Sequence, residues 1–122
     1  MSKQIKTVFD EYQVYYWSPK KAKSLKRNIT VKLKYNNIQI GTLHFYPDND
    51  SSLPSDSVYK GSKGTRITLN FFERQYEHIL DLIRNESPMW ISIVANVGSN
   101  YGSYPGTGEI TTSDEPVGEE ET

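Results

Sequence analysis

Apolar and polar residues alternate most clearly in the second quarter of the chain, which predicts a β-hairpin. Apolar side chains take every second position in residues 29–35, and the alternation resumes in residues 38–46. Such alternation is typical of strands with one buried face. Asn36 and Asn37 separate the two runs, and asparagine tolerates the positive φ of a two-residue turn. The apolar phase then shifts across Gly41, which predicts a β-bulge there.

A helical period replaces the alternation after residue 70. The apolar residues at helical spacing are Phe72, Tyr76, Ile79, Leu80 and Ile83. This stripe predicts an amphipathic helix that packs on the sheet. Asn70 is the expected N-cap, and Glu73 three residues later completes a capping-box pattern. Ser87-Pro88 is the expected end of the helix.

The rest of the chain predicts further strands separated by polar connections. The expected strands are 7–17, 65–69, 89–97 and 109–112, and the expected connections are 20–28, 47–64 and 98–108. We therefore expect an α+β fold, a mostly antiparallel sheet of about five strands with one amphipathic helix packed on one face. Residues 1–112 are expected to form this single domain. Residues 113–122 are acidic, contain Pro and Gly, and are expected to be a disordered tail.

Composition narrows the chemistry. The chain has 122 residues and no cysteine, which excludes disulfides, thiolate metal sites and cysteine nucleophiles. No apolar run is long enough for a signal peptide or a membrane helix, so we expect a cytoplasmic protein that does not enter a membrane.

Charge is divided unevenly along the chain. Residues 1–35 hold nine Lys or Arg against two acids, whereas residues 87–122 hold six acids and no base. This asymmetry suggests an anionic partner, or a tail that occupies the site for one. The sequence pI of about 6.1 is lower than is usual for a dedicated nucleic-acid domain.

Catalytic and metal-binding patterns are weak. His44 and His78 are the only histidines, and no G-x-S-x-G sequence accompanies them. Residues 48–52, with Asp56 nearby, offer oxygen ligands but lack the Gly and Glu of an EF-hand loop. Residues 61–64 resemble a phosphate loop but precede a predicted strand rather than a helix. We therefore expect no enzyme, no metal site and no cofactor.

Two binding hypotheses remain. The first is a protein partner, bound through Tyr101 and Tyr104 of the predicted 98–108 loop and through acidic residues near the C-terminus. Those acidic residues are Asp114, Glu115, Glu119, Glu120 and Glu121. The alternative is a single-stranded nucleic acid, because aromatic side chains precede a basic cluster and single-strand binders combine the two. The residues concerned are Tyr15, Trp17, Lys20, Lys21, Lys23, Lys26 and Arg27. A flexible basic connector beside packed aromatics is the structural alternative to that site.

Three sequence segments carry a family resemblance. They are Gly41 with Phe45-Tyr46-Pro47-Asp48 and Leu53-Pro54, then Asp81-Leu82-Ile83-Arg84-Asn85-Glu86-Ser87-Pro88, and then Glu115-Pro116-Val117-Gly118-Glu119-Glu120-Glu121. Together they resemble a family of small uncharacterised bacterial proteins with a "DLLRNE-x-P" helix end and an "EPVGEGE" tail. Glu120 stands where that tail has glycine. The resemblance covers roughly residues 41–121 and brings no activity, cofactor or site residue. The leading hypothesis is therefore a small non-catalytic interaction module of a bacterial cytoplasm.

Overall fold

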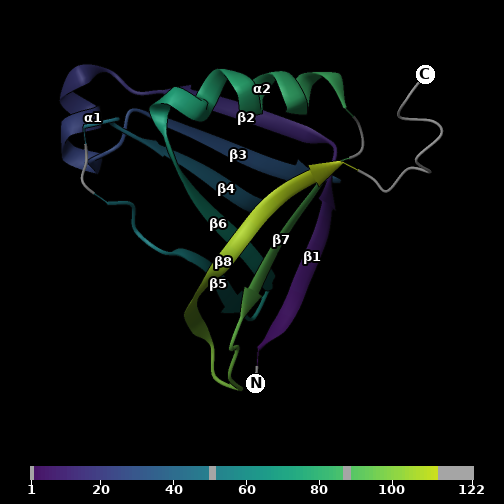
Figure 1. Ribbon diagram of the computed structural model, residues 1–122. Coiled ribbons are helices and arrows are strands. Elements are labelled where there is room, and N and C mark those ends of the chain that lie inside the picture. Colours follow the sequence, from purple (N-terminus) through teal and green to yellow (C-terminus); the bar gives the residue numbers. More distant parts are fainter. Residues whose placement is uncertain (1, 50–51, 87–88, 113–122) are drawn as a thin grey trace.

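The computed structural model describes residues 2–49, 52–86 and 89–112 and is mostly sheet. Strands make up 58% of it and form a single eight-stranded, mixed sheet that curls into a half-barrel (Figure 1). The prediction of about five mostly antiparallel strands under one amphipathic helix was therefore wrong. The strands are β1 (Lys3–Phe9), β2 (Glu11–Tyr16), β3 (Ile29–Tyr35), β4 (Ile38–Tyr46), β5 (Asp56–Gly61), β6 (Gly64–Phe72), β7 (Met89–Ala95) and β8 (Gly102–Thr112). The helices are α1 (Pro19–Leu25), the 3-10 turn η1 (Glu73–Gln75) and α2 (Tyr76–Asn85).

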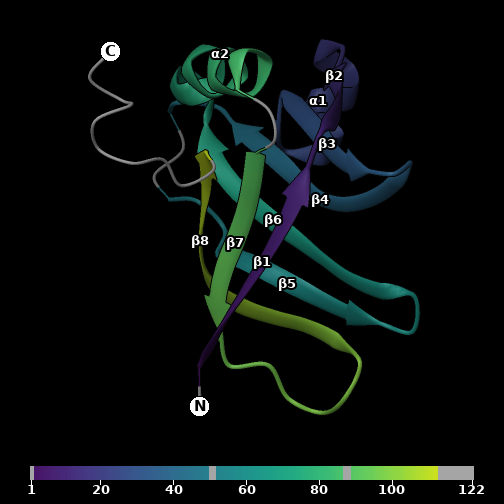
Figure 2. The ribbon, with the colours of Figure 1, turned by 90° about the vertical axis from the view of Figure 1, so that its right-hand side faces the viewer.

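The strand order explains the curl of the sheet. The order is β1-β7-β8-β5-β6-β4-β3-β2, and among the described strands only β4 and β6 pair in parallel. β1 and β2 thus form the two edges, although Asp10 alone separates them in the sequence. The Asp10 amide also donates a hydrogen bond of 3.1 Å to the carbonyl of Lys34 on β3. One bend therefore carries the chain from one edge to the other and brings the edges together (Figure 2).

The first predicted hairpin is confirmed. β3 and β4 pair antiparallel around Asn36 and Asn37, whose φ angles are 53° and 64°. The register shifts by one residue where Leu33 pairs with Gly41 and Lys34 with Gln39, which leaves Ile40 unpaired and places the bulge directly before Gly41. A Cβ atom at Gly41 would lie 2.9 Å from the Ile67 carbonyl oxygen, so the close approach of β6 requires glycine there.

Two segments predicted as loops contain strands. The 98–108 segment belongs mostly to β8, and the 47–64 segment contains β5. β8 pairs with β5 over residues 102–106 and with β7 over residues 106–112. Pro105 lies just before the β7 ladder begins, so its missing N–H leaves that ladder intact.

The helices also differ from the prediction. The expected basic connector contains α1, which begins at Pro19 because proline fits the first helical position. Asn70 lies inside β6 rather than at an N-cap, and its backbone N–H donates a hydrogen bond of 2.8 Å to the Asp56 carboxylate. The predicted end at Ser87-Pro88 lies outside the described residues. Within the described part of the chain, no helix is long and apolar enough to cross a membrane.

The core fills the concave side of the sheet. Alternate residues of all eight strands point inward, and α2 lies across one end of the half-barrel with Ile79 and Ile83 buried against them (Figures 1 and 2). Asp56 lies at the start of β5 and also bonds to β8. Its second carboxylate oxygen accepts a hydrogen bond of 3.0 Å from the Gly108 amide. The opposite, outer face of the sheet is left for polar and aromatic side chains.

Candidate nucleic-acid interface

An aromatic stack lies on the outer face of β2. Tyr15 and Trp17 are two residues apart and so point to the same side of the strand. Their ring centroids lie 5.1 Å apart at an interplanar angle of 22°. Lys32, on the neighbouring β3, holds its ammonium nitrogen 4.8 Å from the centroid of the Tyr15 ring. A cation and two stacked rings therefore share one small surface.

A row of polar side chains fixes the orientation of Trp17. Its indole N–H donates to the Thr30 hydroxyl oxygen at 3.0 Å, and this oxygen lies 3.4 Å from Nδ1 of His44. Burial, together with the nearby Arg27 guanidinium, lowers the pKa of His44 from 6.5 to about 4. The imidazole is therefore neutral at pH 7, and its Nδ1 can accept the Thr30 proton. Because Thr30 is buried, this row holds the indole against the sheet.

The basic cluster continues from the stack along α1. Lys20, Lys21, Lys23 and Lys26 are exposed, while Ala22 is buried and attaches the helix to the sheet. Lys26 ends the helix in the left-handed conformation, with φ 63°, and its amide donates to the Ala22 carbonyl. The ion pairs among the described residues are Arg74–Asp48 and Arg84–Asp81, neither of which involves this cluster. These four lysines therefore face solvent with no acidic partner in the described part of the chain, whereas Arg27 is half-buried.

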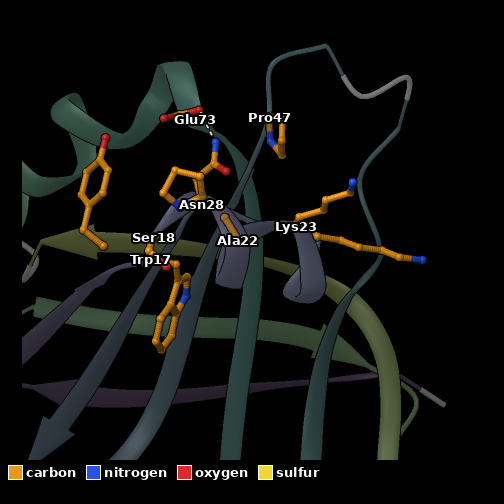
Figure 3. A pocket seen from close by; sticks show the side chains of 10 residues that line it. Trp17, Ser18, Ala22, Lys23, Asn28, Pro47 and Glu73 are labelled. Atoms are coloured by element: carbon orange, nitrogen blue, oxygen red, sulfur yellow. Dashed lines mark hydrogen bonds between the residues drawn. The ribbon is translucent and has the colours of Figure 1, made fainter.

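A pocket of about 880 Å³ opens between α1 and the start of η1. Tyr16, Pro19, Ala22 and Pro47 form its aromatic and apolar walls. Its polar lining residues are Ser18, Lys23, Lys26, Asn28 and Glu73, and Trp17 joins it to the stack. Figure 3 shows Asn28 reaching toward Glu73, while the Trp17 indole points away from that pair. The pocket and the stack therefore adjoin at Trp17.

The two tyrosines proposed for a protein partner differ in exposure. Tyr101 is 67% exposed, but the Tyr104 ring packs against the core and its hydroxyl donates to the Asn100 carbonyl at 2.6 Å. Tyr104 thereby supports the connection between β7 and β8. The acidic residues from Asp114 to Glu121 lie outside the described residues.

The structure adds residues that the sequence hypothesis omitted. Lys32, Thr30 and His44 join the stack because strand pairing aligns Tyr15 with Thr30 and Thr30 with His44. The polar phase of the 29–35 alternation placed Lys32 and Thr30 on the outer face, and that signal was visible in the sequence. The sequence did not show the register in which β2 pairs with β3. It also did not show that Glu73 approaches Asn28.

In the oxygen-rich 48–56 segment, the carboxylates of Asp48 and Asp56 have structural roles. Asp48 accepts a hydrogen bond of 2.9 Å from the Arg74 amide at the start of η1, and Asp56 links β6 to β8. Within the described ranges, no group of three His, Asp or Glu side chains is placed to hold a metal ion.

Comparisons with protein-family models, with curated proteins and with solved structures find no match. The family resemblance of residues 41–121 therefore stays a prediction from the sequence.

Proposed function

We propose that this protein binds single-stranded nucleic acid on the outer face of β2 and β3 and along α1. The observation that carries the proposal is the Tyr15–Trp17 stack with Lys32 over one ring and the α1 lysines beside it. Aromatic rings supply stacking surfaces for bases of any sequence, and a row of cations follows the phosphates. The proposal thus adopts the alternative hypothesis of the sequence rather than the leading one.

The net charge supports the proposal once the tail is counted separately. Residues 1–112 hold 14 basic and ten acidic residues, a net charge of +4, whereas residues 113–122 add five acids. The overall charge of −1 and the moderate pI therefore result from the five acids of residues 113–122, whereas residues 1–112 are positively charged. A positive domain raises the local concentration of an anionic strand and speeds its association.

Replacing Trp17 tests the stacking part of the proposal. We expect Trp17→Leu to weaken binding of a fluorescein-labelled 12-nucleotide single strand about 5- to 150-fold in fluorescence anisotropy, since stacking contributes about 1–3 kcal/mol per base. Trp90→Leu is the matched control, because Trp90 lies on the outer face of β7 beneath Lys6, at 5.2 Å from its ammonium nitrogen. Equal losses of affinity in the two variants would contradict the proposal, and so would a failure of the wild-type protein to bind the strand at low salt. Thermal melting confirms that both variants fold.

The charge part is tested in the same assay by salt dependence. Lys32→Gln should reduce the slope of log affinity against log salt by about 0.7, the value for one neutralised phosphate of a single strand. Lys6→Gln changes the charge equally, but Lys6 lies on β1 over the Trp90 ring of β7 rather than over the Tyr15 ring. It should leave the slope unchanged, and an equal reduction in both variants would show only a general charge effect.

Protein binding through Tyr101 is the second candidate function. The observation in its favour is a largely exposed tyrosine in a tethered connection, where Lys60 donates hydrogen bonds to the Gly98 and Ser99 carbonyls. A rigid exposed tyrosine is a common contact residue in protein interfaces. If this function is correct, a partner captured from bacterial lysate will be lost with Tyr101→Ser and kept with the exposed control Tyr59→Ser. A partner retained equally by both variants would exclude this role for Tyr101.

A further inference from the structure

We infer that the pocket between α1 and η1 takes one base of the bound strand and prefers guanine. The inference rests on the proposed function and names the part of that surface which reads sequence. The stack on β2 offers no pattern of hydrogen-bonding groups that distinguishes bases, whereas the pocket contains a carboxylate and an amide.

The pocket has the volume and the lining that a planar ring requires. Its volume of about 880 Å³ lies within the range of small-molecule sites, about 300–1,000 Å³. The rings of Tyr16 and Tyr76 are nearly perpendicular at a centroid distance of 6.2 Å. Tyr16 is 68% exposed, so its ring surface is available for stacking. Pro19 and Pro47 complete the apolar lining.

The polar lining presents hydrogen-bond acceptors. Asn28 donates from Nδ2 to one carboxylate oxygen of Glu73 at 2.7 Å (Figure 3). This bond orients the Glu73 carboxylate and leaves its second oxygen and the Asn28 amide oxygen as acceptors. Guanine carries adjacent donors, N1–H and the N2 amino group, on its Watson–Crick edge. The corresponding edges of adenine, cytosine and thymine each place an acceptor beside their donor, and a carboxylate repels that acceptor.

The cations beside the pocket fit the backbone of the same strand. Lys23 and Lys26 line the pocket from α1, while Glu73 belongs to η1. Figure 3 shows the Lys23 side chain extending from α1 away from the Glu73–Asn28 pair. A base directed at Glu73 would therefore leave its phosphate near the lysines. Trp17 lines the pocket and belongs to the stack, so the two binding sites for neighbouring bases adjoin at this residue.

The test compares two labelled strands, a nine-residue oligothymidylate and the same strand with one central guanine. We expect wild type to bind the guanine strand about 5- to 150-fold more tightly, the range for a bidentate base contact. Glu73→Gln should abolish this preference while retaining affinity for oligothymidylate. Glu77→Gln is the matched control, because Glu77 is exposed one turn later and does not line this pocket. Its preference should equal that of wild type.

A strand with inosine in place of guanine supplies a test that needs no variant. Inosine lacks the N2 amino group, so it should lose part of the preference, and adenine should lose all of it. Equal binding of guanine and thymine strands by wild type would overturn the pocket inference and leave the proposed function standing. A preference that survives Glu73→Gln would also overturn it. Failure of every strand to bind would overturn both.

Discussion

His44 is the side chain whose protonation the fold changes most. It lies mid-strand in β4, and burial together with Arg27 lowers its pKa from 6.5 to about 4. The neutral ring completes the Trp17–Thr30–His44 row, so the residue that titrates also supports the proposed interface. Protonation places a cation beside Arg27 and removes the acceptor at Nδ1.

The depressed pKa of His44 predicts a loss of stability in acid. Between pH 6.5 and 4 the unfolded chain binds a proton that the native state does not, so the free energy of unfolding falls as the pH falls. The loss in the free energy of unfolding that is due to His44 reaches about 3 kcal/mol below pH 4. Urea unfolding at pH 7.5, 5.5 and 4.0 should therefore show a smaller decline for His44→Gln than for wild type. His78→Gln, at an exposed histidine, should follow wild type, and parallel declines in all three proteins would contradict the assignment.

Single-residue chemistry was partly visible in the sequence. Tyr15, Trp17 and the α1 lysines were predicted as neighbours because they are close along the chain. Glu73 was predicted as a capping residue of the helix, but its carboxylate accepts a hydrogen bond from Asn28, 45 positions earlier. Such a contact depends on the tertiary fold, and local sequence patterns carry no information about it.

β8 is the element in which composition was most misleading. Its Gly, Ser, Thr and Pro residues are typical of a loop. The structure needs glycine there because β8 lies between β7 and β5 in the sheet and approaches the β7 backbone closely. A Cβ atom at Gly108 would meet Leu69 Cδ2 and would lie 2.6 Å from the Ser92 carbonyl oxygen. Small residues thus mark close packing in this strand rather than a flexible connection.

The packing of β8 predicts a steep cost for a methyl group at Gly108. We expect Gly108→Ala to lower the free energy of unfolding by about 2–3 kcal/mol, because overpacking a well-filled core has costs of this order. Thr107→Ala is the control on the same strand, at an exposed position that faces outward. Chemical denaturation of both variants measures the difference. A Gly108→Ala protein as stable as Thr107→Ala would show that β8 is not packed as described.

At the scale of the whole molecule, the order of the strands determines what the surface can do. Local patterns identified the β3–β4 hairpin, the apolar β7 and the apolar stripe of α2. They could not predict the parallel pairing of β4 with β6 or the return of β1 to the edge opposite β2, since both join segments distant in the sequence. That order leaves β2, β3 and α1 at one end of the curled sheet, where the basic N-terminal third becomes a surface (Figure 1).

The indole N–H signals of the two tryptophans test the central claim most directly. In a ¹⁵N-labelled protein titrated with a 12-nucleotide single strand at low salt, we expect the Trp17 indole signal to shift in a saturable way. The Trp90 signal, from the outer face of β7, should stay in place. High salt should reverse the Trp17 shift. A Trp17 signal that does not move at saturating strand, or one that moves together with Trp90, would contradict nucleic-acid binding at this surface.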